Sequence, residues 1–439
     1  MKMKDLKFIF RDSSVLDLDV MVVAQRLTEK IENLRNIDEN HYKINESAIN
    51  LPYDAEYIND IKELIDEKKK LNPSYIVVIG IGGSNLGTIA VQEAIYGKLY
   101  NELNPKVKIL YADTVDSDTI DRIMKIIEPV LKNGGNILLN AISKSGSTTE
   151  TIANFEILVE LLKRYKKDYN KYIVITSDEG SNFWNLAQKE DFDTLAIPKK
   201  VVGRYSVLSA VGVFPLGFIG IDIIELLKGA RQISKICLNA EIKNNPAVIS
   251  ASLKYINYKR GKNIHNLFIF SPDLESLGKW YKQLAGESIG KEYNLKGERV
   301  IVGITPTVSI GSTDLHSMVQ LYLGGPADKF TTFVKIKKNK NIVKVPDNGD
   351  SGLVKGISGK RLQTIMRAIY KGVTKAYIVR KRPFIEIHML DKSEYSIGQF
   401  LQFMMIETML LGYLLEINPF NQPNVEEYKV ETRRILEKE

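Results

Sequence analysis

A turn rich in hydroxyl groups at residues 143–151 (SKSGSTTET) is the stretch whose residue types and spacing best suit binding chemistry. Its nine residues carry six hydroxyl side chains, more than the N-cap of one helix requires. It follows a strand-like run and precedes a helical pattern, so its N–H groups are expected at a helix start. Such groups suit the oxygens of a phosphomonoester, and Lys144 adds positive charge. A capping loop without a ligand is the alternative.

A second candidate is the glycine-rich turn at residues 80–87 (GIGGSNLG), which also follows a strand-like run and opens a helix. Glycines let the backbone approach an anion closely. A dinucleotide site would fit as well, because Asp113 ends the next predicted strand, where an acid that binds ribose belongs. However, Asn85 replaces the third glycine of that fingerprint, and Ser84 stands beside it. The turn by itself leaves a nucleotide, a sugar phosphate and a purely structural role open.

Both turns lie in a sequence that alternates short β-branched runs with helical stretches, which predicts an α/β fold with two doubly wound parallel sheets. The predicted strands are residues 75–80, 107–113, 136–143 and 171–177, then 266–273, 299–307, 331–337 and 383–390. Helices are predicted in the second half at 275–289, 315–323, 359–377 and 397–416. Because neighbouring parallel strands end at one edge of a sheet, we expect the two turns to line one crevice.

The same pattern predicts how the chain is divided. We expect a mostly helical N-terminal segment (1–70), a first sheet domain (71–222), a helical bridge (223–260), a second sheet domain (261–417) and a C-terminal tail helix (418–439). A chain of 439 residues with 44% apolar content is long enough to fill the cores of two such domains.

Charge and composition limit the partners and the location. The net charge of +8 arises from 61 basic and 53 acidic residues spread along the chain, which favours anionic metabolites over nucleic acid. The single cysteine, Cys237, fits a reducing compartment. The apolar stretch 403–417 contains Glu407 and is too short to span a bilayer, so we expect a buried helix there. Without a secretory signal at the N-terminus, we expect a cytoplasmic protein that binds neither membrane nor nucleic acid.

The hydroxyl-rich turn resembles the phosphate-binding loop of sugar isomerase (SIS) domains, and the chain as a whole resembles the glucose-6-phosphate isomerase family. Residues 202–212 (VGRYSVLSAVG) are similar to one signature of that family, and residues 420–429 (FNQPNVEEYK) to the other. The resemblance covers roughly residues 75–429. It implies two sugar isomerase domains, a homodimer, no cofactor, and reversible conversion of glucose 6-phosphate to fructose 6-phosphate through a cis-enediolate.

Catalytic roles follow from the resemblance, position by position. Glu287 matches the base, and Arg204 with the backbone of Gly203 matches the group beside the enediolate. His316 matches the histidine that helps to open the sugar ring, which in this family comes from the partner subunit. Lys429 matches the lysine that acts on the ring oxygen.

Substrate contacts follow in the same way. Ser143, Ser145 and Thr148 match phosphate contacts, with Ser84 and Lys144 close to them. The remaining substrate-binding positions are Glu150, Gln283 and Gln422. The sequence departs from the family pattern at Asn85, where aspartate is common, and at Gly146, which replaces an aromatic residue. These departures bear on fine substrate discrimination.

These residue types fit an aldose–ketose isomerisation, in which one proton moves between neighbouring carbons. A single carboxylate above both carbons can carry that proton. Glu287 lies at the edge of the apolar stripe of its predicted helix, and Arg204 stays charged beside the negative intermediate. The sequence contains no His-Glu-x-x-His or Cys-x-x-Cys spacing, which argues for chemistry without a metal. A non-catalytic sugar-phosphate sensor and an NAD-dependent enzyme remain as alternatives.

Overall fold

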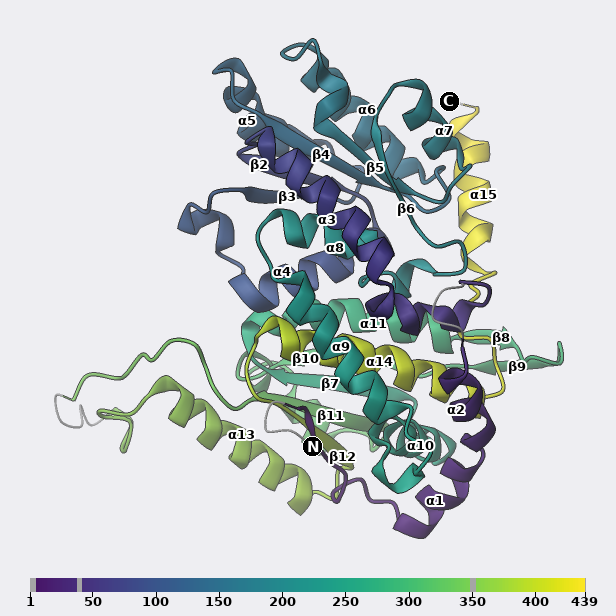
Figure 1. The fold of residues 1–439 in the computed structure, drawn as a ribbon. Coiled ribbons are helices and arrows are strands. Elements are labelled where there is room, and N and C mark those ends of the chain that lie inside the picture. Colours follow the sequence, from purple (N-terminus) through teal and green to yellow (C-terminus); the bar gives the residue numbers. More distant parts are fainter. Residues whose placement is uncertain (1–4, 38–41, 348–352, 439) are drawn as a thin grey trace.

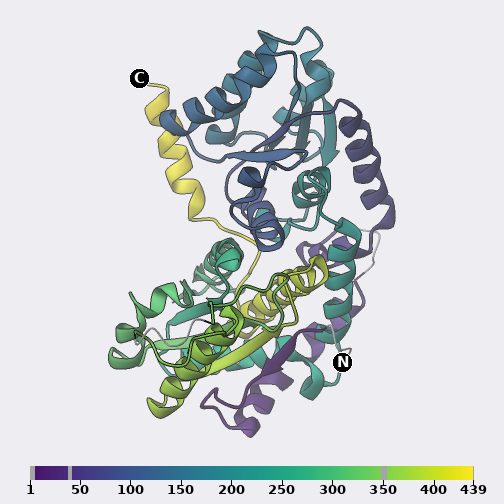
Figure 2. The ribbon, with the colours of Figure 1, turned by 90° about the vertical axis from the view of Figure 1, so that its left-hand side faces the viewer.

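Two five-stranded sheets, each flanked by helices, form the body of the protein in the computed structural model, which describes residues 5–37, 42–347 and 353–438. One sheet lies in the upper half of the molecule and the other in the lower half (Figure 1). A view turned by 90° shows the two halves joined by helices near the middle (Figure 2). The predicted α/β class with parallel sheets is therefore confirmed.

The upper sheet is entirely parallel and runs in the order β3-β2-β4-β5-β6. Its strands are largely buried because helices cover both faces of the sheet, as the continuous β-branched runs predict. The strands are β2 (Tyr75–Ile79), β3 (Lys108–Ala112), β4 (Ile137–Ile142), β5 (Ile173–Ser177) and β6 (Asp193–Ala196). Sequence analysis missed β6, whose four residues DTLA contain only one β-branched residue.

Helices of this half are α3 (Ala55–Lys70), α4 (Leu86–Tyr96), α5 (Ser117–Lys132), α6 (Thr149–Lys163), α7 (Asn182–Lys189) and α8 (Ala210–Phe218). The chain passes from β2 outward to β3 and then returns across β2 to β4. The order of the sheet therefore reverses between β2 and β4, and a crevice is expected at the carboxyl ends of these two strands. The glycine-rich turn follows β2 and the hydroxyl-rich turn follows β4, so both occupy this position.

The lower sheet has the order β1-β12-β11-β7-β10 and is parallel except for β1. Its strands are β1 (Lys7–Ile9), β7 (Ile264–Phe270), β10 (Thr305–Ile310), β11 (Lys329–Ile336) and β12 (Phe384–Met389). The N-terminal segment, predicted to be mostly helical, thus also contributes an edge strand. It contains α1 (Asp17–Gln25) and α2 (Thr28–Arg35) before α3.

The prediction of one strand at residues 299–307 is wrong. Residues Arg299–Val302 form β9, which pairs with β8 (Lys291–Tyr293) in a separate hairpin, and Thr305–Ile310 form β10. Gly303 lies between the two strands, and a Cβ atom added there would lie 3.5 Å from the Cα atom of Gly290.

Other helices of this half are α9 (Ile223–Cys237), α10 (Pro246–Lys259), α11 (Glu275–Ile289), α12 (Val319–Gly324), α13 (Leu362–Val379) and α14 (Glu394–Leu414). The predicted helix 315–323 begins instead as a 3-10 turn at Thr313–Leu315, before α12. The prediction of 275–289 agrees with α11 at both ends.

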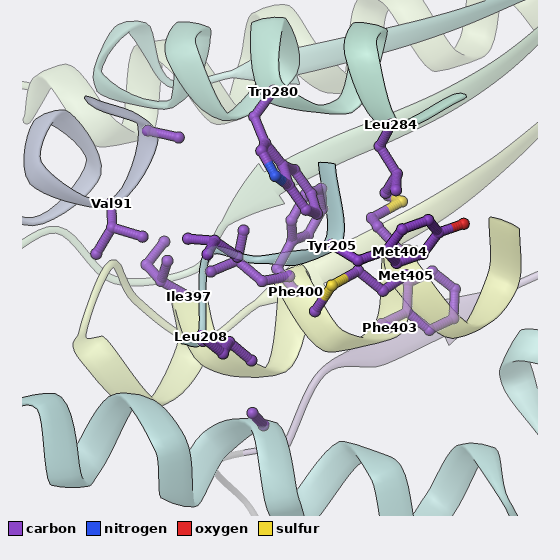
Figure 3. Packing of buried hydrophobic residues seen from close by; sticks show 14 of the residues in the cluster. Val91, Tyr205, Leu208, Trp280, Leu284, Ile397, Phe400, Phe403, Met404 and Met405 are labelled. Carbon is purple, nitrogen blue, oxygen red and sulfur yellow. The ribbon is translucent and has the colours of Figure 1, made fainter. Parts of the chain in front are cut away.

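The core is centred on α14, which packs against α9, α10 and α11. Trp280 and Leu284 of α11 point toward Tyr205 and toward Phe400 and Met404 of α14 (Figure 3). By length and composition α14 would be long and apolar enough to cross a membrane, but 94% of its most apolar window is buried inside the protein. Within this helix Glu407 is buried, and it accepts a hydrogen bond from Lys254 at 2.6 Å.

The tail helix α15 (Val425–Leu436) has no buried residue. It follows a short connection after α14 and lies beside the upper half of the molecule in both views (Figures 1 and 2). Its position therefore depends on few contacts with the rest of the chain.

Candidate active site

The hydroxyl-rich turn forms the open start of helix α6. Thr148 is the N-cap residue, yet its side chain accepts no bond from the first turn of the helix. Instead, the hydroxyls of Ser143 and Thr148 lie 3.0 Å apart. The N–H groups of the first turn of α6 are thus left for an external acceptor, and the helix dipole favours an anion there.

The outer part of the turn carries the hydroxyls of Ser145 and Ser147, which lie 3.3 Å apart. Gly146 between them has φ +68°, and a Cβ atom there would lie 2.7 Å from the amide nitrogen of Phe183. Because both the backbone angle and the contact exclude a side chain, glycine is required at this position. Glu150, another predicted substrate contact, lies in the first turn of α6 and is only partly exposed.

Lys144 points to the other side of this turn. Its ammonium group donates to the carbonyl oxygen of Lys199 at 2.6 Å and lies 3.9 Å from a carboxylate oxygen of Asp178. Burial lowers the pKa of Lys144, an effect that Asp178 opposes. A direct bond from Lys144 to a bound phosphate would require these contacts to be exchanged.

The glycine-rich turn packs against two other predicted site residues. A Cβ atom on Gly83 would lie 2.3 Å from the carbonyl carbon of Gly203, and one on Gly82 would lie 2.9 Å from Nε2 of Gln283. Gly82 also has φ +61°. These glycines therefore allow three chain segments to lie in close contact, and this packing accounts for the glycines without a bound dinucleotide. Within the glycine-rich turn, Ser84 is the last residue of the 3-10 turn η2 (Gly82–Ser84) and is partly exposed.

Asn85, which also belongs to the glycine-rich turn, is 1% exposed, and neither atom of its side-chain amide has a hydrogen-bond partner among the described residues. This position is the N-cap of α4, but its side chain does not cap the helix.

Arg204 is the centre of a second group of site residues. It lies in the 3-10 turn η5 (Gly203–Tyr205) and is only 2% exposed, yet every nitrogen of its guanidinium group is bonded. Nε donates to Ser288 at 2.8 Å. Nη1 donates to Glu287 at 3.0 Å and to Gln422 at 2.7 Å. Nη2 donates to the carbonyl oxygens of Pro419 and Asn421, at 2.8 and 3.4 Å.

Glu287 occupies the last turn of α11 and keeps contact with solvent, since 32% of its side chain is exposed. One carboxylate oxygen accepts from Arg204 and the other accepts from Gln283 at 3.0 Å. The predicted apolar face of this helix is buried, and it includes Ser288. The carboxylate is thus held by two fixed donors while one side stays open to a ligand.

Sequence analysis missed Ser288, which bonds Arg204 and lies 3.2 Å from the hydroxyl of Tyr205. A serine in the apolar stripe of an amphipathic helix is the signal that could have identified it, since a buried hydroxyl needs a partner.

The structure does not bring every predicted residue together. His316 follows the 3-10 turn Thr313–Leu315 and is exposed, and Lys429 lies on α15, where it pairs with Glu426 at 2.8 Å. Within the described ranges, neither side chain bonds to Arg204 or Glu287. A hollow between α6 and α7, lined by Gly146 and Phe183 among others, lies beside the hydroxyl-rich turn and does not include Glu287.

Two largely parallel sheets, a hydroxyl-rich turn where the strand order reverses, and a carboxylate paired with a buried arginine are typical of the phosphosugar isomerase class. Comparison with known proteins identifies the family more closely. Residues 68–439 match the model of the phosphoglucose isomerase family, and the chain belongs to that family.

Individual relatives agree with this assignment. A glucose-6-phosphate isomerase from Carboxydothermus hydrogenoformans is 34% identical over 431 residues, covering 96% of this chain and 91% of the relative. The structure of a hypothetical protein from Thermus thermophilus superposes with a TM-score of 0.86 at 30% identity, covering 98% of this chain and 99% of that one. A glucose-6-phosphate isomerase from Chlamydia trachomatis shares the fold, with a TM-score of 0.84 at 20% identity and coverage of 99% and 89%.

Proposed function

We propose that this chain interconverts glucose 6-phosphate and fructose 6-phosphate, with Glu287 as the base that carries the proton between C2 and C1. The observation that carries the proposal is the bonding of the buried Arg204, which holds Glu287 and Gln422 side by side. Arginine stays charged, so the carboxylate beside it is kept ready to accept a proton from carbon and to return it.

In this proposal the phosphate is bound by the first sheet domain (71–222). The hydroxyls of Ser143, Ser145 and Thr148 and the open start of α6 supply donors, and Ser84 lies on the neighbouring turn. The close contact of Gly83 with Gly203 joins this phosphate site to Arg204. The sugar then extends toward Glu287, which the second sheet domain (261–417) supplies.

In this proposal, Arg204 and the backbone of Gly203 stabilise the negative charge of the enediolate. Within the described ranges, the N–H group of Gly203 has no acceptor in the protein. All five N–H groups of Arg204 already bond to the protein, so the guanidinium stabilises the oxyanion through its charge, and the free N–H group of Gly203 is the donor in position for it.

Ring opening is assigned to His316 and Lys429. His316 is exposed in a single chain, and we propose that it enters the site of a second subunit in a homodimer. Lys429 lies on α15, which has no buried residue, and we propose that this helix moves toward the site and brings its ammonium group to the ring oxygen. We further propose that the enzyme works in the cytoplasm and without a metal or a nucleotide.

A coupled assay for glucose 6-phosphate, run with and without a chelator, tests the activity. Glu287→Gln is expected to lower kcat by at least about a thousandfold, because the amide cannot accept the proton. Because glutamine keeps the shape of the side chain, Kd for a non-isomerisable sugar phosphate should stay within about threefold. Retained activity in this variant would mean that Glu287 is not the base. Loss of wild-type activity with the chelator would contradict the metal-free mechanism.

A further inference from the structure

Lys291 lies directly behind Glu287, at the junction of helix α11 and the hairpin β8-β9. It is 7% exposed and is the first residue of β8. Its ammonium group donates to the carbonyl oxygen of Glu287 and lies 3.3 Å from that of Gly290. The side chain therefore folds back onto the end of the helix that carries the base, although a lysine usually keeps its ammonium group in water.

The two carbonyl groups belong to the end of α11, where the helix can no longer supply N–H donors. The N–H group of Gly290 bonds to Gly286 at 3.1 Å, so it does not serve the carbonyl oxygen of Glu287. The ammonium group of Lys291 donates there, and a cation in this place also complements the negative end of the helix dipole. Lys291 therefore closes the turn from which the side chain of Glu287 projects.

Two charged groups act on Lys291 from the elements around it: Arg204 from η5 and Glu287 from α11. The adjoining hairpin carries Glu292 and Arg299, which pair with each other at 3.0 Å. Burial, and to a smaller degree the charge of Arg204, lowers the pKa of Lys291 to about 8, against the opposing effect of Glu287. At neutral pH Glu287 thus lies between two cations, of which Arg204 binds its carboxylate and Lys291 binds its backbone.

We propose that Lys291 is a positioning residue for the isomerisation, which closes the last turn of α11 and so keeps the Glu287 carboxylate against Arg204 and Gln283. This inference rests on the proposed function, in which Glu287 is the base. A rotation of this turn would move the carboxylate away from the carbons between which it transfers a proton, and misplacement by about 1 Å costs up to about a hundredfold in rate.

The test compares Lys291→Met, which keeps the length of the side chain but removes the charge and the donors, with Lys291→Arg, which keeps both. The matched control is Lys279→Met on the same helix, where the side chain is 55% exposed and pairs with Glu275. For each variant, kcat and KM for fructose 6-phosphate are measured across pH, and folding is checked by thermal melting. If Lys291→Met does not fold, Lys291→Gln, which also lacks the charge, is measured in its place.

Lys291→Met is expected to lower kcat about ten- to hundredfold with KM within about twofold of wild type. Lys291→Arg should restore kcat to within about threefold of wild type, and Lys279→Met should match wild type.

A folded Lys291→Met with wild-type kcat would overturn the inference. Equal loss of kcat in Lys291→Met and Lys291→Arg would also overturn it, since a side chain needed only for packing would not be rescued by arginine. An inactive wild type or an active Glu287→Gln would refute the proposed function, whatever the Lys291 variants show.

Discussion

Replacing Arg204 with lysine tests the role of its guanidinium group, because this change keeps the positive charge and removes the planar group with its five donors. The guanidinium group makes five hydrogen bonds, to Ser288, Glu287, Gln422 and the carbonyl oxygens of Pro419 and Asn421. An ammonium group has three donors on one atom, so at least two of these acceptors lose their partner.

The size of the effect follows from which acceptors are lost. Each buried acceptor left without a donor costs about 1–3 kcal/mol, so the free energy of unfolding should fall by roughly 2–6 kcal/mol. If the positive charge of the ammonium group lies farther from the enediolate oxygen, the transition state loses electrostatic stabilisation, which lowers kcat about 100- to 1,000-fold. Phosphate binding should be spared, because Ser143 and Thr148 bond each other and not Arg204.

A coupled assay gives kcat, thermal melting gives stability, and titration with sorbitol 6-phosphate, which cannot isomerise, gives Kd. Arg260→Lys is the matched control, since the side chain of Arg260 is exposed and its guanidinium group bonds to Ser14 and Asp19 at the surface. We expect its kcat and melting temperature to match wild type. A folded Arg204→Lys protein with kcat within about twofold of wild type would refute the role given to the guanidinium group.

Two further predictions concern the assembly of the site. Gly83→Ala should lower kcat by at least about tenfold, since its Cβ atom would lie 2.3 Å from Gly203 and must displace the segment that carries Arg204. Gly372→Ala is the control, because nothing lies within 4 Å of the added atom. Equal kcat values for the two variants would contradict this prediction. If His316 acts in the partner's site, mixing inactive Glu287→Gln and His316→Ala subunits should restore about a quarter of wild-type activity, because about half of the dimers are mixed and each has one intact site. Size-exclusion chromatography with light scattering checks the dimer, and mixtures that stay inactive although the subunits exchange would show that His316 serves its own chain.

Much of the fold could be predicted because its elements depend on local patterns. Continuous β-branched runs indicated the long buried strands of both sheets, and the prediction failed where local signals were weak. β6 has only four residues, and β9 and β10 follow each other so closely that they read as one strand. β1 is a three-residue edge strand whose pairing with β12 joins residues far apart in the chain.

The two turns and their place at strand ends could be predicted from the sequence alone, because glycine angles and helix starts are local properties. The sequence also placed Glu287 at the edge of an apolar stripe. The contacts of Arg204 with Glu287 and with Gln422 join residues 83 and 218 positions apart, so they depend on how the elements pack. A buried guanidinium group needs hydrogen-bond acceptors for its donors, and here they come from segments that are distant in the chain. Such contacts produce no periodic pattern in the sequence, so they could not be predicted from it.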